Sequence, residues 1–422
     1  MESNFEKEVQ ERAVLVGLNA DCFTKEQTAT DETLEELEAL LETAGGFCTA
    51  KVMQNRHTPD SHSFIGEGKA QEVRMLAEAT ESTMVIFDNE LSPGNIRALE
   101  EIIGLPVLDR SALILDIFAQ RARTKEGRLQ VELAQYQYLL PRLSGMGSSL
   151  SRQGGGIGTR GPGETKLESD RRHIRERIHR LEEELEQVRQ VRSVQRERRM
   201  KNSVPVVAIV GYTNAGKSTL LNKLTGAGIP ANNRLFDTLD TTSRQLKVSD
   251  NLDVILSDTV GFIAKLPHHL VNAFQATLEE LEYADLLLHV IDASDPNREE
   301  HIAVVDKLIA QLARKETPVL RCYNKADLVA KEDIPTGQDI VATSAAMGQG
   351  MEQLLAAIEN ALGHARHHVT LCLPYSMGGQ VETLHNNAQV TSVDYTADGI
   401  EIEAVLDDIL YGRLKDYITK EC

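Results

Sequence analysis

The stretch "VPVVAIVGYTNAGKST", Val204 to Thr219, decides the fold of this chain. Its first half is a continuous apolar run, which is typical of a strand in a parallel sheet covered on both faces. From Gly211 to Ser218 it matches the pattern GxxxxGK[ST], a phosphate-binding loop that joins a strand to a helix. We therefore expect a P-loop nucleotide-binding domain of the α/β class.

The residue types in this loop suit a bound triphosphate. Gly211 and Gly216 let the backbone turn so that its N–H groups point at phosphate oxygens. Lys217 brings positive charge to the β- and γ-phosphates, Ser218 offers a hydroxyl to Mg²⁺, and the following helix adds its N-terminal dipole. The loop residues predicted to bind nucleotide are Gly211, Asn214, Ala215, Gly216, Lys217, Ser218 and Thr219.

The segment "DTVG", Asp258 to Gly261, follows the apolar run "LDVILSD". At that position an Asp can hold Mg²⁺ through water, and a Gly N–H can approach the γ-phosphate. The predicted metal ligands are Ser218, Thr238 and Asp258.

Two later segments favour guanine as the base. In "NKAD", Asn324 to Asp327, the Asp327 carboxylate can accept both N–H groups of the guanine edge, which adenine does not offer. Lys325 can lie along the base plane, and a backbone N–H of Ser344 or Ala345 can meet the guanine O6. Because a wrong base would leave such polar groups unpaired, the discrimination can be large. Asn324, Lys325, Asp327, Ser344 and Ala345 complete the predicted GTP site.

The expected catalytic residues are Lys217, Thr238, Gly261 and Phe262. A threonine in "FDTLDTTSR" should complete the Mg²⁺ shell and sense the γ-phosphate; Thr238 is our prediction, with Thr241 and Thr242 as the alternatives. Phe262 stands where Ras-like enzymes carry a glutamine that orients water. Because Phe cannot orient water, we expect slow intrinsic hydrolysis that a partner accelerates by about 10³–10⁵-fold.

Composition describes an ordinary globular protein of 422 residues, 41% hydrophobic, with a net charge of −19. That charge excludes a basic nucleic-acid coat protein and argues against a peripheral binder of anionic membranes. We read neither a signal peptide nor an apolar run long enough to cross a membrane, and we expect a cytoplasmic protein. We also expect a monomer. The scattered cysteines favour a reducing compartment over a disulfide framework. They are Cys22, Cys48, Cys322, Cys372 and Cys422.

Four regions separate by pattern. In residues 1–120, short apolar runs such as "AVLVGL" and "MVIFD" alternate with helical stretches such as "PGNIRALEEIIG", which has Pro93 and Asn95 at its start. This alternation of strands and helices predicts a small, mainly parallel sheet. Residues 204–363 repeat strand and helix, with helices expected at 268–281 and 298–312. The last region contains three strand-like runs. The predicted division is an N-terminal α/β subdomain (1–120), a helical hairpin (121–203), a P-loop GTPase domain (204–363) and a small α+β domain (364–422).

The hairpin prediction rests on two narrow apolar seams. Leu129, Leu133, Tyr136 and Leu140 form one; Ile174, Ile178, Leu181, Leu185 and Val188 form the other. The alternative is a single long solvated helix, which would leave both seams exposed. The intervening segment, residues 144–166, carries eight glycines and cannot bury enough surface to order itself.

The segment "FIGEGKAQE" in the N-terminal region suggests a second nucleotide site, but a tight turn before a helix fits its spacing better.

Together these motifs resemble the HflX family of GTPases. The resemblance rests on "GGGIGTRGPGETKLESDRRHIRERI", "LFDTLDTTSR", "DTVGFIAKLPHHLVNAFQATLEE" and "SFIGEGKAQE" and covers nearly the whole chain. Members commonly read "ATLDPT" where this chain has "DTLDTT". The resemblance implies a GTPase that binds the large ribosomal subunit and splits stalled or idle 70S ribosomes, often under heat stress. It also implies GTP and Mg²⁺ as ligands, a hairpin loop that reaches ribosomal RNA, and ATP binding in some members.

Local charge supports an RNA contact. Residues 142–200 carry 14 Lys and Arg against 9 Asp and Glu within an acidic chain. Backbone and arginine in a slender glycine-rich loop can meet phosphates without bulk. Arg152, Arg160 and Lys166 are the predicted contacts; the alternative is a flexible solvated linker.

Two other functions remain open from the sequence. The same motifs fit a ribosome-assembly GTPase that acts on precursor large subunits. A nucleotide-gated scaffold for a protein partner is a third interpretation, although the glycine-rich loop lacks the aromatic anchors that protein interfaces favour.

Overall fold

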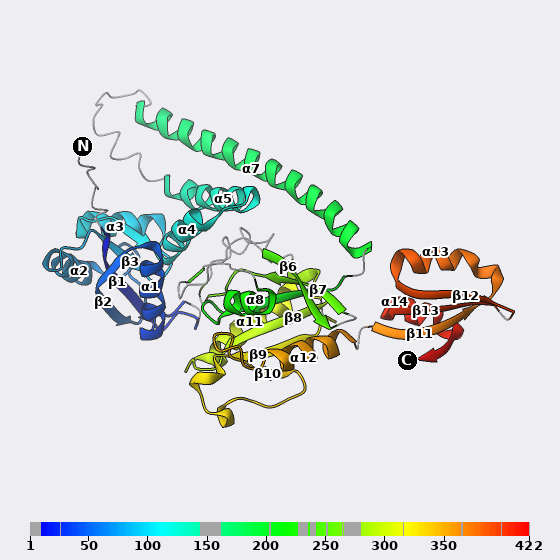
Figure 1. Cartoon of the computed structure of the whole chain (residues 1–422). Helices are drawn as coiled ribbons and strands as arrows, with labels where there is room; N and C mark the ends of the chain where they lie inside the picture. The colour runs from blue at the N-terminus through cyan, green and yellow to red at the C-terminus, as the bar shows by residue number, and fades with distance from the viewer. Residues whose placement is uncertain are drawn as a thin grey trace, which may run out of the picture. The chain divides into compact units, whose positions relative to one another are not determined.

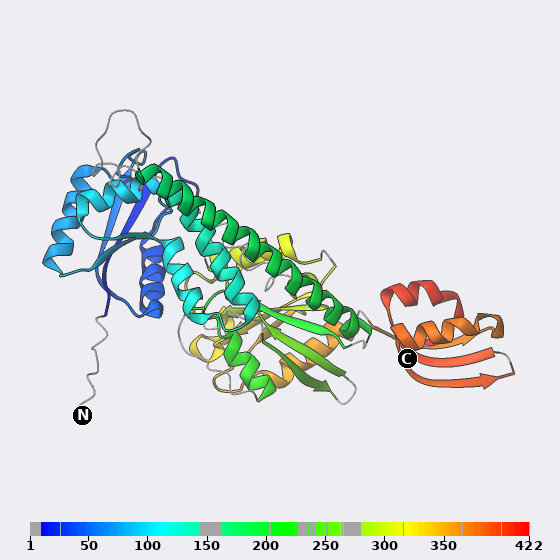
Figure 2. The same cartoon turned by 90° about the horizontal axis from the view of Figure 1, so that it is seen from above.

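The computed structural model describes residues 10–25, 27–143, 162–201, 204–226, 235–236, 242–249, 252–263, 265, 280–314, 316–363, 366–397 and 399–421. The chain divides into two compact units. Figures 1 and 2 show the helices and strands of the chain in two views. The first comprises Met1–Glu186, Asn232–Asp240 and Ile263–Gln275; the second comprises Gln187–Ala231, Thr241–Phe262 and Ala276–Cys422. The finer division into four domains stays a prediction.

A four-stranded parallel sheet in the order β2-β1-β3-β4 organises the first unit. The strands are β1 (Arg12–Ala20), β2 (Phe47–Arg56), β3 (Met84–Phe87) and β4 (Val107–Asp109). The helices between and after them are α1 (Asp31–Ala44), α2 (Glu67–Ala79), α3 (Pro93–Ile103) and α4 (Arg110–Arg121). This confirms the predicted βα alternation and parallel sheet.

Local signals in the sequence set the helix ends. Thr30 caps α1 in a reciprocal capping box with Thr33, and α1 ends before Gly45. In α3 the expected start at Pro93 is confirmed, but the cap is Ser92, whose side chain accepts from the Asn95 N–H. The "FIGEGKAQE" segment forms a turn before α2, which agrees with the second of its two interpretations.

Two long helices follow, α5 (Lys125–Arg142) and α7 (Pro162–Lys201). Leu129, Leu181 and Leu185 of the predicted seams are buried. The Arg177 guanidinium donates through two nitrogens to the Glu132 carboxylate, each at 2.9 Å. The two helices are therefore paired, and the alternative of one solvated helix is wrong. Of the predicted loop, residues 144–166, the part 144–161 lies outside the described residues. Residues 162–166 belong to the first turns of α7, so the prediction of a loop was wrong for them.

The second unit contains a six-stranded sheet in the order β10-β9-β8-β5-β7-β6. Its strands are β5 (Val206–Gly211), β6 (Thr242–Ser249), β7 (Leu252–Asp258), β8 (Leu286–Asp292), β9 (Val319–Asn324) and β10 (Ile340–Ala342). Its helices are α8 (Lys217–Thr225), α11 (Arg298–Leu312) and α12 (Met351–Gly363). Helices α8 and α12 share one apolar cluster with the strands, and α11 packs through Ile302 against a second cluster.

Five of these strands are parallel, as predicted, but β6 runs antiparallel to β7. The connection between Ser249 and Leu252 is too short for the crossover that parallel strands need. The predicted helix at 298–312 is α11. The one predicted at 268–281 lies almost wholly outside the described residues.

A four-stranded antiparallel sheet in the order β12-β13-β11-β14 forms the C-terminal part of the second unit. Its elements are β11 (Arg366–Leu373), α13 (Gly378–Asn387), β12 (Gln389–Thr396), β13 (Gly399–Asp407), α14 (Asp408–Leu414) and β14 (Ile418–Glu421). Leu384 of α13 and Leu410 of α14 pack with the inward-facing residues of the sheet. The predicted small α+β module is confirmed. Within the described part of the chain, no helix has the length and apolarity to cross a membrane.

Candidate nucleotide-binding site

The P-loop lies between β5 and α8, as the sequence predicts, and its two glycines are required by close approaches. A Cβ on Gly211 would lie 2.2 Å from the Val290 carbonyl oxygen on the neighbouring strand. Gly216 has a φ of +93°, and a Cβ there would lie 2.3 Å from the Asn324 Nδ2. Side chains at either position would push the loop away from the strands that support it.

Lys217 begins α8 and folds back along the loop. Its Nζ donates to the carbonyl oxygens of Gly211 at 3.0 Å and Tyr212 at 2.7 Å. The residue is only 7% exposed, and this burial lowers the pKa of its ammonium group to about 8, while the charge of Asp258 opposes the shift. A phosphate group would supply the negative charge that this buried cation lacks.

Ser218 and Asp258 lie together, as predicted for the metal ligands. The Ser218 hydroxyl donates to the Asp258 carboxylate at 2.9 Å, and Asp258 is 1% exposed at the end of β7. The neighbouring Thr259 hydroxyl donates to the Ile209 carbonyl at 2.6 Å, which fixes the end of β7 against β5. A hydroxyl beside a carboxylate is a set of oxygen donors that fits Mg²⁺.

Gly261 and Phe262 lie against the P-loop. The Phe262 N–H donates to the Gly211 carbonyl at 3.1 Å, and the Phe262 carbonyl accepts from the Thr213 N–H at 2.7 Å. A Cβ on Gly261 would lie 3.0 Å from the Lys217 Nζ. The backbone of this segment is thus placed beside the phosphate-binding lysine, and the Phe262 side chain is buried.

On the side of the site where the guanine base is expected, the Asn324 side chain joins two loops. Its Nδ2 donates to the Ala215 carbonyl of the P-loop, and its Oδ1 accepts from the Ala345 N–H, both at 2.9 Å. Lys325 has a φ of +59° and donates through Nζ to the Asp292 carboxylate at 2.6 Å. The sequence assigned Asn324 and Lys325 to nucleotide binding, and the structure shows protein contacts that position each of them.

Asp327 is exposed in a short 3₁₀ turn directly after Lys325, so its carboxylate is accessible to a base. Ser344 and Ala345 follow β10, as expected. Their N–H groups donate to the Gln349 carbonyl at 3.0 Å and to Asn324. A guanine O6 would therefore either share one of these N–H groups with its present acceptor or replace that acceptor.

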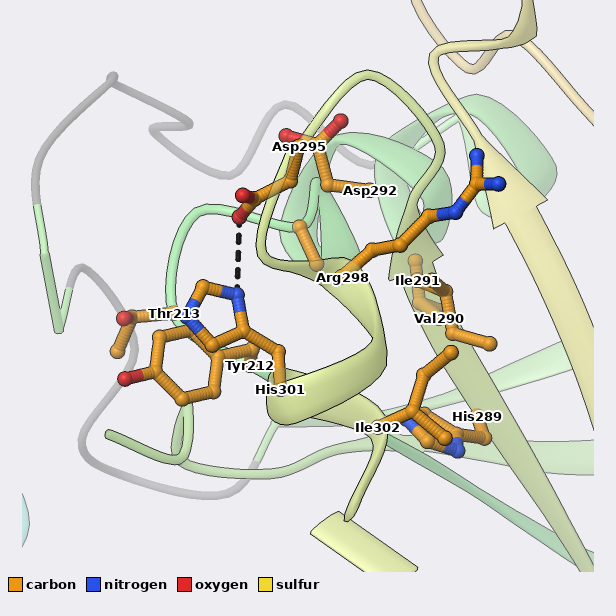
Figure 3. A pocket seen from close by; sticks show the side chains of 11 residues that line it. Tyr212, Thr213, His289, Val290, Ile291, Asp292, Asp295, Arg298, His301 and Ile302 are labelled. Atoms are coloured by element: carbon orange, nitrogen blue, oxygen red, sulfur yellow. Dashed lines mark ion pairs between the residues drawn. The ribbon is translucent and has the colours of Figure 1, made fainter. Parts of the chain in front are cut away.

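One supporting contact was not predicted. The Tyr212 ring stacks on the His301 ring of α11, with centroids 3.6 Å apart, and His301 pairs with Asp295 at 2.9 Å (Figure 3). These residues line a cavity of about 20 Å³ behind the P-loop, together with the buried His289. Burial lowers the pKa of His289, which favours the neutral ring. The sequence carried no signal for the stack, since Tyr212 and His301 belong to separate elements.

The remaining predicted residues divide into those that the structure describes and those that it does not. Asn214 is exposed at the tip of the P-loop with a φ of +60°, and Thr219 lies in the first turn of α8. Thr242, the second alternative switch threonine, lies on β6 opposite Asp258. Lys166 belongs to α7, but its side chain lies outside the described residues. The other predicted positions outside the described residues are Thr238, Thr241, Arg152 and Arg160.

Comparison with known proteins agrees with this geometry. Three family models match: "GTP-binding GTPase N-terminal" over residues 31–119, "GTP-binding GTPase Middle Region" over 121–199, and "50S ribosome-binding GTPase" over 206–325. GTPase HflX from Caldanaerobacter subterraneus subsp. tengcongensis is 48% identical over 97% of this chain and 94% of its own. This chain belongs to the HflX family of GTPases. The Escherichia coli K12 member is 45% identical over 87% of each chain.

Family membership fixes the reaction. The chain is a P-loop GTPase, which binds guanine nucleotide and hydrolyses GTP. Among solved structures, SsGBP in complex with GDP matches with a TM-score of 0.50 at 25% identity, over 84% of this chain and 99% of that one. The fold class expected from the sequence is confirmed.

Proposed function

We propose that this HflX family GTPase binds the large ribosomal subunit in the cytoplasm and separates stalled or idle 70S ribosomes into subunits, including under heat stress. The observation that carries the proposal is the match of residues 206–325 to the "50S ribosome-binding GTPase" family, in a chain alignable with GTPase HflX nearly end to end. The splitting of ribosomes is proposed because the sequence resemblance to the HflX family implies it.

The chemistry proposed at the site follows from its geometry. The P-loop amides and Lys217 hold the β- and γ-phosphates, and Asp327 selects guanine. Ser218, Asp258 and Thr238 would hold Mg²⁺, which when bound neutralises charge on the phosphates. Gly261 lies beside the Lys217 Nζ, which is expected to meet the γ-phosphate, and its N–H would approach the same phosphate.

A slow intrinsic rate is part of this proposal. Phe262 has no polar side-chain atom, it is buried, and its backbone N–H and C=O are both bonded to the P-loop. It cannot orient the attacking water, so the ribosome must supply positioning or charge worth about 10³–10⁵-fold in rate. Single-turnover hydrolysis measured with and without 70S ribosomes tests this. A rate that ribosomes do not increase would contradict it.

We propose that Arg152 and Arg160 of the segment between α5 and α7, together with Lys166 near the start of α7, contact ribosomal RNA. The support is the excess of positive charge over residues 142–200 in a chain of net charge −19. The exposed Arg172, Arg175 and Arg180 of α7 continue this positive character along the helix.

Splitting of purified 70S ribosomes is the direct test. Subunit release, measured by light scattering and gradient sedimentation, should occur with GTP or a non-hydrolysable GTP analogue and be weak with GDP. The variant Asp327→Ala should fail because it cannot select guanine. Preferential binding to precursor particles, with intact 70S ribosomes left unsplit, would instead support the assembly GTPase.

A further inference from the structure

Thr213, the third residue of the P-loop, carries a hydroxyl group that is absent from the predicted site. The residue is only 7% exposed, and within the described part of the chain its Oγ1 has no hydrogen-bond partner. A buried polar group without a partner is unfavourable, so it indicates an ordered water, a ligand or a catalytic role. A partner that arrives with the substrate would remove this cost.

The Thr213 side chain lies beside the segment that is expected to face the γ-phosphate. A Cβ built on Gly261 would lie 2.8 Å from the Thr213 methyl carbon, Cγ2, and 3.0 Å from the Lys217 Nζ. Because both distances start from the same point, the Thr213 side chain and the Lys217 ammonium group are close to each other. Lys217 and the Gly261 N–H are the groups expected to meet the γ-phosphate. Thr213 therefore lies at the end of the P-loop where that phosphate is expected to react.

Backbone contacts hold Thr213 in this place. Its N–H donates to the Phe262 carbonyl at 2.7 Å, and the Phe262 N–H donates to the Gly211 carbonyl at 3.1 Å. Tyr212 and Phe262 form a parallel β-bridge between the same two segments. Threonine is also branched at Cβ, which restricts the rotation of its side chain. The hydroxyl is therefore held by a fixed backbone, so little entropy is lost when it aligns with a substrate.

Other hydroxyl groups around the phosphate-binding loop are already engaged. The Thr259 hydroxyl donates to the Ile209 carbonyl at 2.6 Å, and the Ser218 hydroxyl donates to the Asp258 carboxylate at 2.9 Å. Of these three hydroxyl groups, the one on Thr213 is without a partner in the described part of the chain. It is therefore the one available to a group that is present only with GTP.

The chemistry of the site requires such a polar group. Ras-like enzymes orient the attacking water with a glutamine at the position of Phe262, whose side chain is apolar and buried. A hydroxyl can accept a hydrogen bond from water, and it can donate one to a phosphate oxygen. Thr213 can therefore supply part of what Phe262 lacks, from the opposite side of the same backbone contact.

We propose that Thr213 is a catalytic residue for GTP hydrolysis, whose hydroxyl accepts a hydrogen bond from the attacking water and holds it beside the γ-phosphorus. The water oxygen forms a bond to the γ-phosphorus, and the bond from that phosphorus to the bridging oxygen breaks. The bridging oxygen leaves with the electron pair as part of GDP. One proton of the water passes to the released phosphate, and Thr213 neither gains nor loses a proton.

This role rests on the phosphate positions proposed for Lys217 and Gly261. One hydrogen bond supports only the slow reaction of the chain alone, so the larger acceleration proposed for the ribosome is unaffected.

Single-turnover GTP hydrolysis by the full chain without ribosomes tests the proposal. Thr213→Val replaces the hydroxyl with a methyl group of similar size and should lower the rate constant by about 10-fold, the effect of one hydrogen bond. Thr213→Ser keeps the hydroxyl and lacks the methyl group, so its rate should stay within about threefold of the wild-type rate. The affinities for GDP and for a non-hydrolysable GTP analogue should change by less than about threefold in both variants, because the hydroxyl binds the water.

Thr370→Val is the matched control. Thr370 is also buried, at 8% exposed, but it lies on β11 of the C-terminal module, so its replacement should leave the rate unchanged. Because Thr213→Val removes an unpaired buried hydroxyl, its unfolding temperature without nucleotide should be no lower than that of the wild type. A lower rate in that variant then reports on the reaction and not on a damaged fold.

An unchanged rate in Thr213→Val, or an equal loss of rate in Thr213→Ser, would overturn the proposal. The first result would mean that the hydroxyl meets only a water, for example in the cavity of about 20 Å³ that Thr213 helps to line. The second would mean that the methyl packing matters. Failure of the wild-type chain to bind the GTP analogue would instead contradict the assigned nucleotide site, so the two kinds of failure are distinguishable.

Discussion

At the scale of single residues, Asn324 shows how protein contacts hold the parts of the nucleotide site together. One amide side chain links the P-loop at Ala215 to the loop after β10 at Ala345. The motif in the sequence assigned Asn324 to nucleotide binding. It could not show these partners, because they lie 109 and 21 residues away along the chain.

Asn324→Ala should therefore reduce both stability and nucleotide binding. The change leaves the Ala215 carbonyl and the Ala345 N–H without their buried partner, which costs about 1–3 kcal/mol for each group. Urea unfolding and GDP calorimetry measure the two effects. The control is Asn297→Ala, an exposed residue at the start of α11 that makes no side-chain cap. Equal results for both variants would show that Asn324 does not join the loops.

The cysteines give a prediction that depends on pH. Burial raises the pKa of the Cys322 thiol to about 12 and, with the charge of Glu38, that of Cys48 to about 11. Since the thiolate is the reactive form, both should resist thiol reagents at pH 8, while the exposed Cys22 reacts first. Mass spectrometry of peptides after brief labelling in a Cys422→Ser background checks the order. Rapid labelling of Cys322 in folded protein would contradict it.

At the scale of elements, periodicity predicted the α5–α7 pair, and Pro93 marked the start of α3, although the capping residue, Ser92, was not predicted. The direction of β6 was not predicted, because it depends on a short connection to β7 that a list of separate strands does not reveal. The ion pair between Arg177 and Glu132 also escaped prediction, since charged residues occur on almost every side of α7.

The two kinds of contact in the α5–α7 pair should differ in strength. Leu181 is fully buried, so Leu181→Ala should lower the free energy of unfolding by about 2–5 kcal/mol. Arg177 and Glu132 are about one-third exposed, so Arg177→Ala should cost less than about 1 kcal/mol. Denaturant titrations of the two variants give the comparison. A larger effect of the arginine would mean that the ion pair, not the apolar seam, holds the helices together.

At the scale of the whole molecule, charge is unevenly distributed. Residues 142–200 are positive in net charge, whereas the chain as a whole is strongly acidic. An acidic body disfavours indiscriminate RNA contact and leaves the basic segment as the part that phosphates attract.

Replacing Arg152, Arg160 and Lys166 together with Ala should weaken binding to large subunits and flatten its salt dependence. Three lost phosphate contacts should reduce the slope of log affinity against log salt by about 2 to 3. Co-sedimentation over a series of salt concentrations measures it, with Arg74→Ala of α2 as a surface control. An unchanged slope would favour the flexible solvated linker.

The sequence predicted the parts of the molecule that local patterns encode: the P-loop, the continuous apolar strands and the paired helices. It did not predict contacts that distant segments make after folding, such as the Tyr212–His301 stack or the attachment of Lys265 to Asp88. The sequence pattern of a strand involves residues that are close together in the chain, whereas these contacts depend on which distant segments the fold brings together.

The passage of the chain from the second unit into the first at Ile263 affects how truncated forms behave. A GTPase domain expressed without residues 1–120 would expose Phe236 to water and leave Lys265 without its counter-charge. We expect such a fragment to be less stable than the full chain and to self-associate through the newly exposed apolar surface. Kinetic constants measured on such a fragment would reflect the loss of these contacts as well as the properties of the GTPase site.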